Sequence, residues 1–193
     1  MKNLTTHFTN ITKGVSESRP LLQGIHYNQE GGFIAATDSH RLLYFKSEQL
    51  PATFVQNPLT LEFLDGHYPD ITRLLPNGGN NVLFDPKDIT PQFIAFLKAM
   101  KTDIIEIKIQ ADLLSFHKEH EGSFFSIGLQ NTAPENEVIA ANAKYVLQAI
   151  QFVKDAEKYH TRELVTLNYS SCVRPFTFRT ECYQYLTTPI RRS

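Results

Sequence analysis

The feature that most constrains this chain is the order of its periodic segments. A helical pattern is followed by a run of strand patterns once in the first half and twice in the second half. A helix with one apolar stripe has to bury that stripe against another element, and short strands that follow one helix favour antiparallel pairing. The order therefore predicts an α+β fold, with antiparallel sheets and helices packed on one face of them.

Each of the three expected helices has either a clear apolar stripe or a clear start signal. Residues 3–14 repeat apolar side chains at helical spacing, which predicts a short amphipathic helix. Thr90, which precedes a proline, is typical of a helix N-cap, and Asn142 is expected to cap a third, longer helix. The stripe of the first helix consists of Leu4, Phe8, Ile11 and Val15.

The strand patterns are apolar or β-branched runs that are separated by turn-forming residues. The expected strands are residues 21–27, 32–37, 42–45, 59–64, 105–109, 113–117, 123–129, 164–168 continuing into 173–178, and 182–188. Residues 66–81 are rich in glycine, proline and asparagine, so they form the best candidate for a linker. We therefore expect two domains, residues 1–76 and residues 77–193.

Composition and charge exclude several classes of protein. Nineteen basic and twenty acidic residues give a net charge of −1, unlike a strongly basic nucleic-acid binder. There is no run of roughly 18 apolar residues, so we expect a cytoplasmic protein with no membrane partner. In the expected C-terminal hairpin, Cys172 and Cys182 lie several residues out of register, so a disulfide between them is not expected.

Two groups of residues suggest chemistry that their spacing does not support. Asp38, Ser39 and His40 are the residue types of a hydrolase triad, but consecutive residues at a strand end point in different directions. His117 and His120 have a helical metal-ligand spacing, but they lie in an expected hairpin without further ligands. We therefore expect no enzyme, no metal site and no cofactor.

Several motifs resemble the bacterial DNA polymerase III beta subunit, the DNA sliding clamp. In the first half, the motifs Ser-Arg-Pro-Leu-Leu-Gln-Gly, Ala-Thr-Asp-Ser-His-Arg-Leu and Gly-His-Tyr-Pro-Asp-Ile-Thr-Arg-Leu-Leu-Pro, at 18–24, 36–42 and 66–76, resemble the clamp's middle domain. In the second half, residues 142–150, 173–176 and 185–191 resemble its C-terminal domain. The motifs follow the family's order along nearly the whole chain.

The chain departs from the family in two places. Residue 3 already begins the first helix of the middle domain, so we expect no counterpart of the clamp's N-terminal domain. Residues 46–59 have no helical period where the family places a second helix with flanking strands, so the middle domain is expected to be shortened.

The resemblance implies a peptide-binding pocket between the two domains, for short apolar motifs of DNA polymerase or clamp-loader proteins. Its apolar residues would form the floor, while His40, Arg41 and Arg73 would donate hydrogen bonds. Thr187 and Thr188 stand where the family has larger apolar residues. Alternatively, the same residues only close the seam between the domains. The pocket residues carried over by motif are Leu22, Thr37, His40, Arg41, Leu42, Pro69, Arg73, Leu74, Pro189, Ile190 and Arg191.

The resemblance also implies binding of double-stranded DNA without sequence specificity, through lysines on the helices. Lysines near a helix C-terminus can instead simply complement the helix dipole. Two domains cannot encircle DNA alone, so a working clamp would be a homo-oligomer, and the form that encircles DNA would be a ring. The alternative is a clamp-derived peptide-binding module, or decoy, that engages clamp partners without encircling DNA. The expected DNA-facing residues are Lys13, Lys98, Lys101, Lys144, Lys154 and Lys158.

Overall fold

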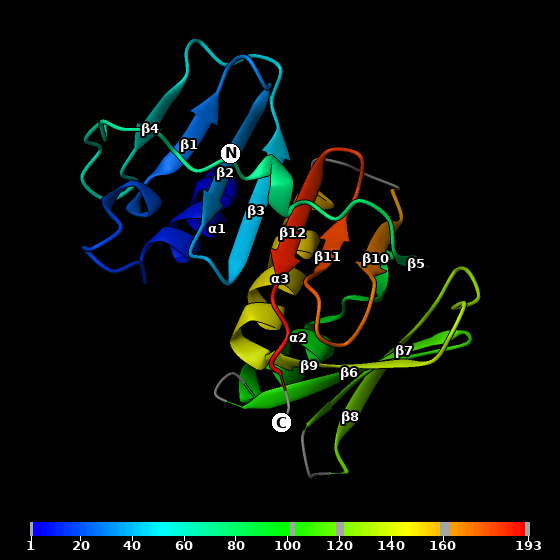
Figure 1. The fold of residues 1–193 in the computed structure, drawn as a ribbon. Helices are drawn as coiled ribbons and strands as arrows, with labels where there is room; N and C mark the ends of the chain where they lie inside the picture. Colours follow the sequence, from blue (N-terminus) through cyan, green and yellow to red (C-terminus); the bar gives the residue numbers. More distant parts are fainter. Residues whose placement is uncertain (1, 101–102, 119–121, 159–162, 192–193) are drawn as a thin grey trace. The chain divides into compact units, whose positions relative to one another are not determined.

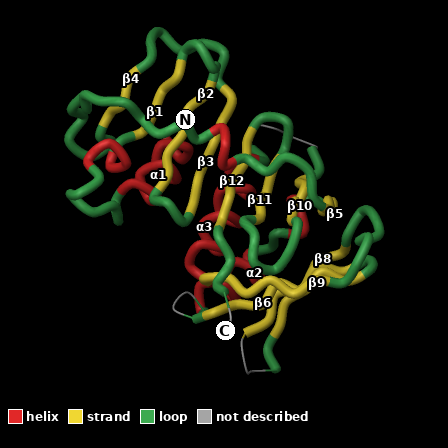
Figure 2. Tube along the Cα trace, viewed as in Figure 1, coloured by secondary structure: helices red, strands yellow, loops and turns green. Residues whose placement is uncertain are grey.

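The computed structural model describes residues 2–100, 103–118, 122–158 and 163–191, and the chain forms two compact units. Unit 1 consists of Met1–Leu75 with Glu181–Tyr185, and unit 2 consists of Pro76–Thr180 with Leu186–Ser193. In both units, α-helices accompany antiparallel strands (Figures 1 and 2). The predicted α+β class is therefore confirmed.

Unit 1 is built on one antiparallel sheet with the strand order β4-β1-β2-β3. Helix α1 packs on β1, β2 and β3, and it buries Phe8 and Ile11. In the described part of unit 1, α1 is the single α-helix. The elements are α1 (Lys2–Thr12), the 3-10 helix η1 (Pro20–Gln23), β1 (Ile25–Asn28), β2 (Phe33–Thr37), β3 (Arg41–Lys46), β4 (Phe54–Gln56) and the 3-10 helix η2 (Thr72–Leu74).

One face of this sheet is covered by irregular chain. His26 pairs with Ala35, and Thr37 pairs with Leu42, so these four side chains share a face. Tyr68 lies on that face, because its ring stacks on the His26 ring at a centroid distance of 4.6 Å. The segment 66–75 thus contributes its buried residues to the core of unit 1.

Unit 2 contains two helices that pack against each other. Strands β6 to β9 form one antiparallel sheet in the order β8-β7-β6-β9, and β11, β10 and β5 are successive neighbours in a second sheet. Helix α2 packs on the first sheet, since the Phe93 ring stacks on Phe125 at 4.7 Å. The elements are β5 (Asn80–Phe84), the 3-10 helix η3 (Pro86–Asp88), α2 (Pro91–Ala99), β6 (Ile104–Gln110), β7 (Leu113–Lys118), β8 (Phe124–Gly128), β9 (Glu137–Asn142), α3 (Ala143–Ala156), β10 (Val165–Tyr169) and β11 (Phe176–Arg179).

Strand β12 (Tyr183–Thr187) contributes residues to both units. Its start is tied to β3 within unit 1, because the Lys46 amide donates a hydrogen bond of 2.8 Å to the Cys182 carbonyl oxygen. Both cysteines, Cys172 and Cys182, are free thiols.

The predicted helix starts are confirmed. The Thr90 hydroxyl accepts a hydrogen bond from the Phe93 amide, and the Asn142 side chain accepts from the Lys144 and Tyr145 amides. These caps satisfy amides that have no partner inside the helix.

Three strand predictions are wrong in part. The expected strand 59–64 makes only a bridge at Phe63, because the Asn57 side chain accepts from the amides of residues 59 and 60 and turns the chain. The single strand expected over 164–178 is a hairpin of β10 and β11. The first residues of the expected strand 21–27 belong to η1, which starts at a proline with its backbone already set for a helical turn.

Candidate functional site

The connection between β2 and β3 is a tight turn, and most of its polar groups bind within the turn. The Thr37 hydroxyl donates a 2.7 Å hydrogen bond to the Arg41 carbonyl oxygen, and the Asp38 carboxylate accepts from the amides of His40 and Arg41. Ser39 has a left-handed backbone (φ 76°), and its hydroxyl accepts a hydrogen bond from the Arg19 guanidinium. Asp38 and Ser39 therefore stabilise the turn. Their side chains do not converge with His40 as a catalytic triad requires.

The turn is fixed further by an ion pair. Arg41 donates from Nε and Nη2 to Asp38 Oδ2 at 2.9 and 2.6 Å, and the two side chains are 5% and 10% exposed. Arg41 Nη2 also lies 3.4 Å from the Asn10 carbonyl oxygen of α1. A guanidinium that binds one carboxylate oxygen through two nitrogens is held in a fixed orientation. Arg41 thus links the turn to the first helix.

The segment 66–75 passes close to η1 and to the end of β2. Gly66 has a φ of +138°, and a Cβ there would come within 2.9 Å of the Leu21 side chain. Tyr68 is 5% exposed and its pKa is raised by burial, while a backbone contact with Thr37 opposes part of this rise. Tyr68 was not among the expected pocket residues, although it lies in the motif at 66–76, directly before Pro69.

Past Tyr68, the chain presents charged and apolar side chains on the surface. Asp70 accepts hydrogen bonds from the Thr72 hydroxyl and amide and from Arg73 Nε, and these contacts lower the pKa of its carboxyl group. Arg73 is 85% exposed in this pair. Leu74, the last residue of η2, is 50% exposed.

Within unit 1, the structure places the expected pocket residues in two kinds of environment. Thr37 and Leu42 face each other across β2 and β3 and are buried, as is Leu22 in η1. The other expected pocket residues of unit 1, except Arg41, have exposed side chains. These are His40, Pro69, Arg73 and Leu74.

The expected pocket residues of unit 2 follow β12. The Ile190 amide donates a 2.8 Å hydrogen bond to the Ala140 carbonyl oxygen at β9, so this segment is tied to the first sheet of unit 2. Ile190 is half-buried and Arg191 is exposed. Thr187 is fully buried, and its hydroxyl has no hydrogen-bond partner in the described part of the chain. An unpaired buried hydroxyl is destabilising.

The expected DNA-facing lysines differ in their ionic partners. Lys154 pairs with Glu157 at 2.8 Å, and Lys158 pairs with Asp155 at 2.8 Å. The other described members form no ion pair with a described residue, and Lys101 lies outside the described residues. These unpaired lysines are Lys13, Lys98 and Lys144.

His117 lies in a strand, as the expected hairpin implies, and not in a helix. This residue lies in strand β7, where its Nε2 is 2.9 Å from the Ser115 hydroxyl and its ring stacks on Phe124 at 5.1 Å. His120 lies outside the described residues. Among the residues that the structure describes, no three His, Cys, Asp or Glu side chains are grouped to hold a metal ion. None of the described helices is both long enough and apolar enough to cross a membrane.

Comparison with known proteins gives relatives of one kind. No family model matches the chain. The beta sliding clamp of Streptococcus pneumoniae serotype 4 is 22% identical over an alignment of 232 positions, which covers 95% of this chain and 60% of the relative. The same values hold for the beta sliding clamp of a second Streptococcus pneumoniae strain. The chain thus spans about three fifths of the length of these curated relatives.

Solved structures agree with the sequence comparison. The beta chain of DNA polymerase III from Streptococcus pneumoniae superimposes with a TM-score of 0.72 at 22% identity, covering 98% of this chain and 63% of that chain. The chain has the fold of a beta sliding clamp. The clamp of Bacillus subtilis gives a TM-score of 0.73 at 19% identity, with 99% and 63% coverage. A Helicobacter pylori beta clamp bound to a DNA ligase peptide gives 0.75 at 16% identity, with 97% and 63% coverage. The predicted resemblance to the clamp family is confirmed.

Proposed function

We propose that this protein is a non-enzymatic, clamp-like accessory protein of DNA replication that binds linear peptides of its partner proteins. The fold supports this proposal, and so does the Helicobacter pylori clamp that carries a DNA ligase peptide. The observation that carries it is the turn between β2 and β3, because the buried Asp38–Arg41 pair holds the exposed His40 and the buried Thr37 and Leu42 in a fixed arrangement. A preorganised surface binds a flexible peptide with less loss of entropy.

The proposed peptide contacts in unit 1 divide into a supporting set and a contacting set. Leu22, Thr37 and Leu42 are buried, so they shape the surface from beneath. The exposed residues would touch the peptide, with Leu74 offering apolar area and Arg73 a donor beside Asp70. The same proposal includes three peptide-contacting residues of unit 2. These are Pro189, Ile190 and Arg191.

Peptide binding can be tested with fluorescence anisotropy on a fluorescein-labelled peptide from the clamp-binding segment of a DNA ligase. Leu74→Asp should weaken binding at least about tenfold, because a carboxylate replaces an apolar contact. Leu59→Asp is the matched control, since Leu59 is 63% exposed and Leu74 is 50% exposed in the same unit. Leu42 is a poorer test position, because it is fully buried and its replacement by aspartate would unfold unit 1.

The two parts of the proposed site are then tested separately. Ile190→Asp, in unit 2, should weaken the same peptide about as much as Leu74→Asp does. Unchanged binding in both variants, with Leu59→Asp also unchanged, would show that the peptide binds elsewhere or not at all.

DNA encirclement is a separate part of the proposal, and its support is weaker. On α3, Lys144 and Lys154 lie about 80° apart around the helix axis, so they share one side. Asp155 lies on that side as well and pairs with Lys158, so the positive field there is reduced. A homo-oligomeric ring should stay bound to circular DNA and slide off the same DNA after it is linearised.

A second candidate function is favoured by the single α-helix in the described part of unit 1. A peptide-binding module that does not encircle DNA needs only the peptide surface. Sedimentation velocity at micromolar concentration separates the two candidates. A strict monomer that still binds the ligase peptide would support the module, whereas a closed oligomer retained on circular DNA would support the working clamp.

A further inference from the structure

Unit 1 contains a cleft of about 800 Å³ that shares only Pro69 with the expected peptide-pocket residues. It is lined by the turn between β1 and β2, by residues 53–55 at β4, and by residues 63–72. Its volume lies in the range of pockets that bind small molecules or single side chains. All of its lining residues belong to unit 1, so the cleft is complete within that unit.

Aromatic rings form much of the cleft. The His26 ring stacks on Tyr68 at 4.6 Å with an interplanar angle of 28°, and it meets the edge of Phe33 at 5.6 Å. The Phe54 ring meets Phe63 edge-on at 5.3 Å, and Phe63 is 67% exposed. The aromatic cluster therefore combines an exposed ring with buried rings that support it. Faces of such rings attract cations and planar guanidinium groups.

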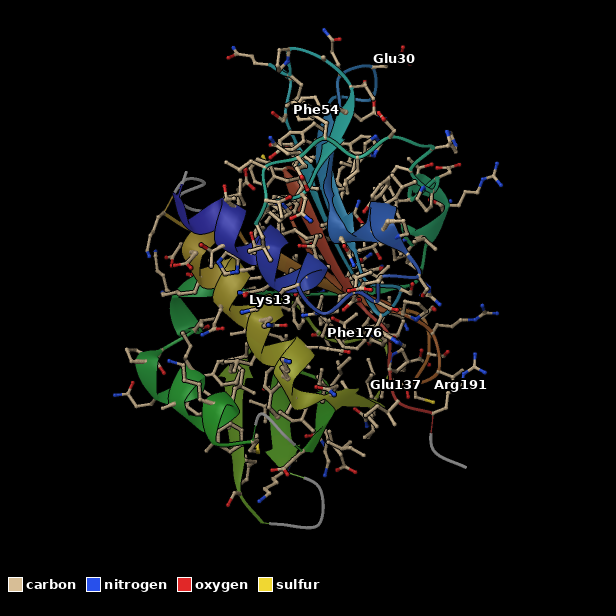
Figure 3. All side chains as sticks on the ribbon, turned by 90° about the vertical axis from the view of Figure 1, so that its left-hand side faces the viewer. Lys13, Glu30, Phe54, Glu137, Phe176 and Arg191 are labelled. Atoms are coloured by element: carbon tan, nitrogen blue, oxygen red, sulfur yellow. The ribbon has the colours of Figure 1, made fainter. Side chains whose placement is uncertain are left out.

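The charges around the cleft have one sign. Glu30, Asp65 and Asp70 line it, and no lysine or arginine is among its described lining residues. Asp70 already binds Thr72 and Arg73, whereas Glu30 and Asp65 are exposed. Glu30 comes from the turn between β1 and β2, at the same end of unit 1 as Phe54 (Figure 3).

His26 does not cancel the negative charge of the carboxylates that line the cleft. The pKa of His26 is lowered, first by burial and then by the neighbouring His67, so its ring is neutral near pH 7. A neutral imidazole stacked on a tyrosine adds aromatic surface without repelling a cation.

We propose that this cleft binds an arginine side chain of a partner protein, which stacks on the aromatic rings and pairs with Glu30 and Asp65. A guanidinium suits the site better than an ammonium, because it is planar, it stacks on rings, and it donates several hydrogen bonds to carboxylates. This site adjoins the proposed peptide surface at Pro69, which lines the cleft, but Leu74 does not line it.

The probe for this site is N-acetyl-arginine methylamide, titrated into the whole protein and followed by NMR on the ring signals of His26 and Phe63. Saturable shifts of these signals are expected. The citrulline analogue, which has the same shape without the charge, should bind at least about fivefold more weakly. The double variant Glu30→Gln with Asp65→Asn should weaken arginine binding about tenfold, and both changes are at exposed positions that tolerate an amide.

Matched variants keep the test specific. Glu48→Gln removes an exposed acid of unit 1 that does not line the cleft, so it should leave arginine binding unchanged. Leu74→Asp should weaken ligase-peptide binding at least about tenfold without moving the arginine titration, so the two sites fail independently. Equal affinity for citrulline or for N-acetyl-lysine methylamide would overturn the assignment of a guanidinium. Unchanged binding in the double variant would overturn the site itself.

Discussion

Units 1 and 2 are built from the same helix-then-strands repeat, but they close their cores differently. Unit 2 packs α2 and α3 against each other, whereas the described part of unit 1 has α1 alone. Unit 1 also exposes three apolar side chains close together, Leu59, Leu61 and Phe63, at 63%, 67% and 67%. Apolar groups this exposed contribute little to a core. Unit 1 therefore depends more on its covering segment 66–75 and on its buried ion pair than unit 2 does.

The largest expected effect comes from removing one buried phenylalanine from a helix of each unit. Phe93 in α2 is fully buried against Phe116 and Phe125, and Phe93→Ala should lower the free energy of unfolding by about 3 to 5 kcal/mol. Phe8→Ala in α1, where Phe8 is 2% exposed, should lower it by about 1 kcal/mol less, because a more open unit can relax around the cavity.

Hydrogen exchange with mass spectrometry measures both variants unit by unit, which avoids assuming that the whole chain unfolds in one step. Protection should fall mainly in unit 2 for Phe93→Ala and mainly in unit 1 for Phe8→Ala. An equal or larger loss for Phe8→Ala would show that unit 1 is as tightly packed as unit 2.

The next effect concerns ion pairs. Arg41→Gln leaves the Asp38 carboxylate buried without its partner, and it should lower the stability of unit 1 by about 3 kcal/mol. In unit 2, Lys158→Gln removes a pair whose side chains are 60% and 31% exposed, and it should change stability by less than about 1 kcal/mol. Urea denaturation followed by circular dichroism gives both values. Similar losses of stability in the two variants would show that unit 1 does not depend more on its buried ion pair than unit 2 depends on its exposed one.

Local signals in the sequence were enough to predict the helices. The Thr90 and Asn142 caps and the apolar stripe of α1 need no information from distant residues. The structure confirms them, except that α1 ends at Thr12 and leaves Val15 outside the helix. Strands β4, β5 and β9 were missed. Their short sequences lack a clear alternation, and their pairing with β1, β10 and β6 is set by chain far away in the sequence.

For the candidate site too, local signals predicted the segments but not their side-chain contacts. Motifs identified the turn at 37–42 and the segment 66–75, which the structure brings close together in unit 1. The sequence could not show that Arg41 is oriented by Asp38, because that depends on side-chain geometry and burial. Contact of Arg41 with a peptide stays a prediction, as do the DNA-facing roles of the lysines.

A smaller effect is expected at the start of α3. The Asn142 side chain accepts from the amides of Lys144 and Tyr145 at 2.9 and 3.4 Å, so Asn142→Ala should lower the stability of unit 2 by about 1 kcal/mol. Asn142→Asp keeps the acceptor and is the control that should retain nearly all of the stability. If Asn142→Ala and Asn142→Asp lowered the stability of unit 2 equally, the Asn142 side chain would act through strand β9 and not as the N-cap of α3.

The smallest expected effect is a pH dependence that differs between His26 in unit 1 and His117 in unit 2. Burial lowers both pKa values below the ordinary 6.5, so in each case the unfolded chain binds the proton more readily. The free energy of unfolding should therefore fall as the pH drops below about 6.5 and stay level above it. For His26, the nearby His67 adds to the effect of burial on the pKa. For His117, Lys108 adds to the effect of burial, and Glu106 opposes it.

His26→Gln should consequently flatten the acid side of the stability profile more than His117→Gln does, measured by urea denaturation between about pH 5 and about pH 8. Because both side chains are partly exposed, the changes should be smaller than those at Arg41. A steeper loss of stability at acid pH in His26→Gln would mean that the folded chain stabilises the protonated imidazole. The cleft would then already contain a strong negative field at His26, and the neutral aromatic wall inferred for its arginine site would be wrong.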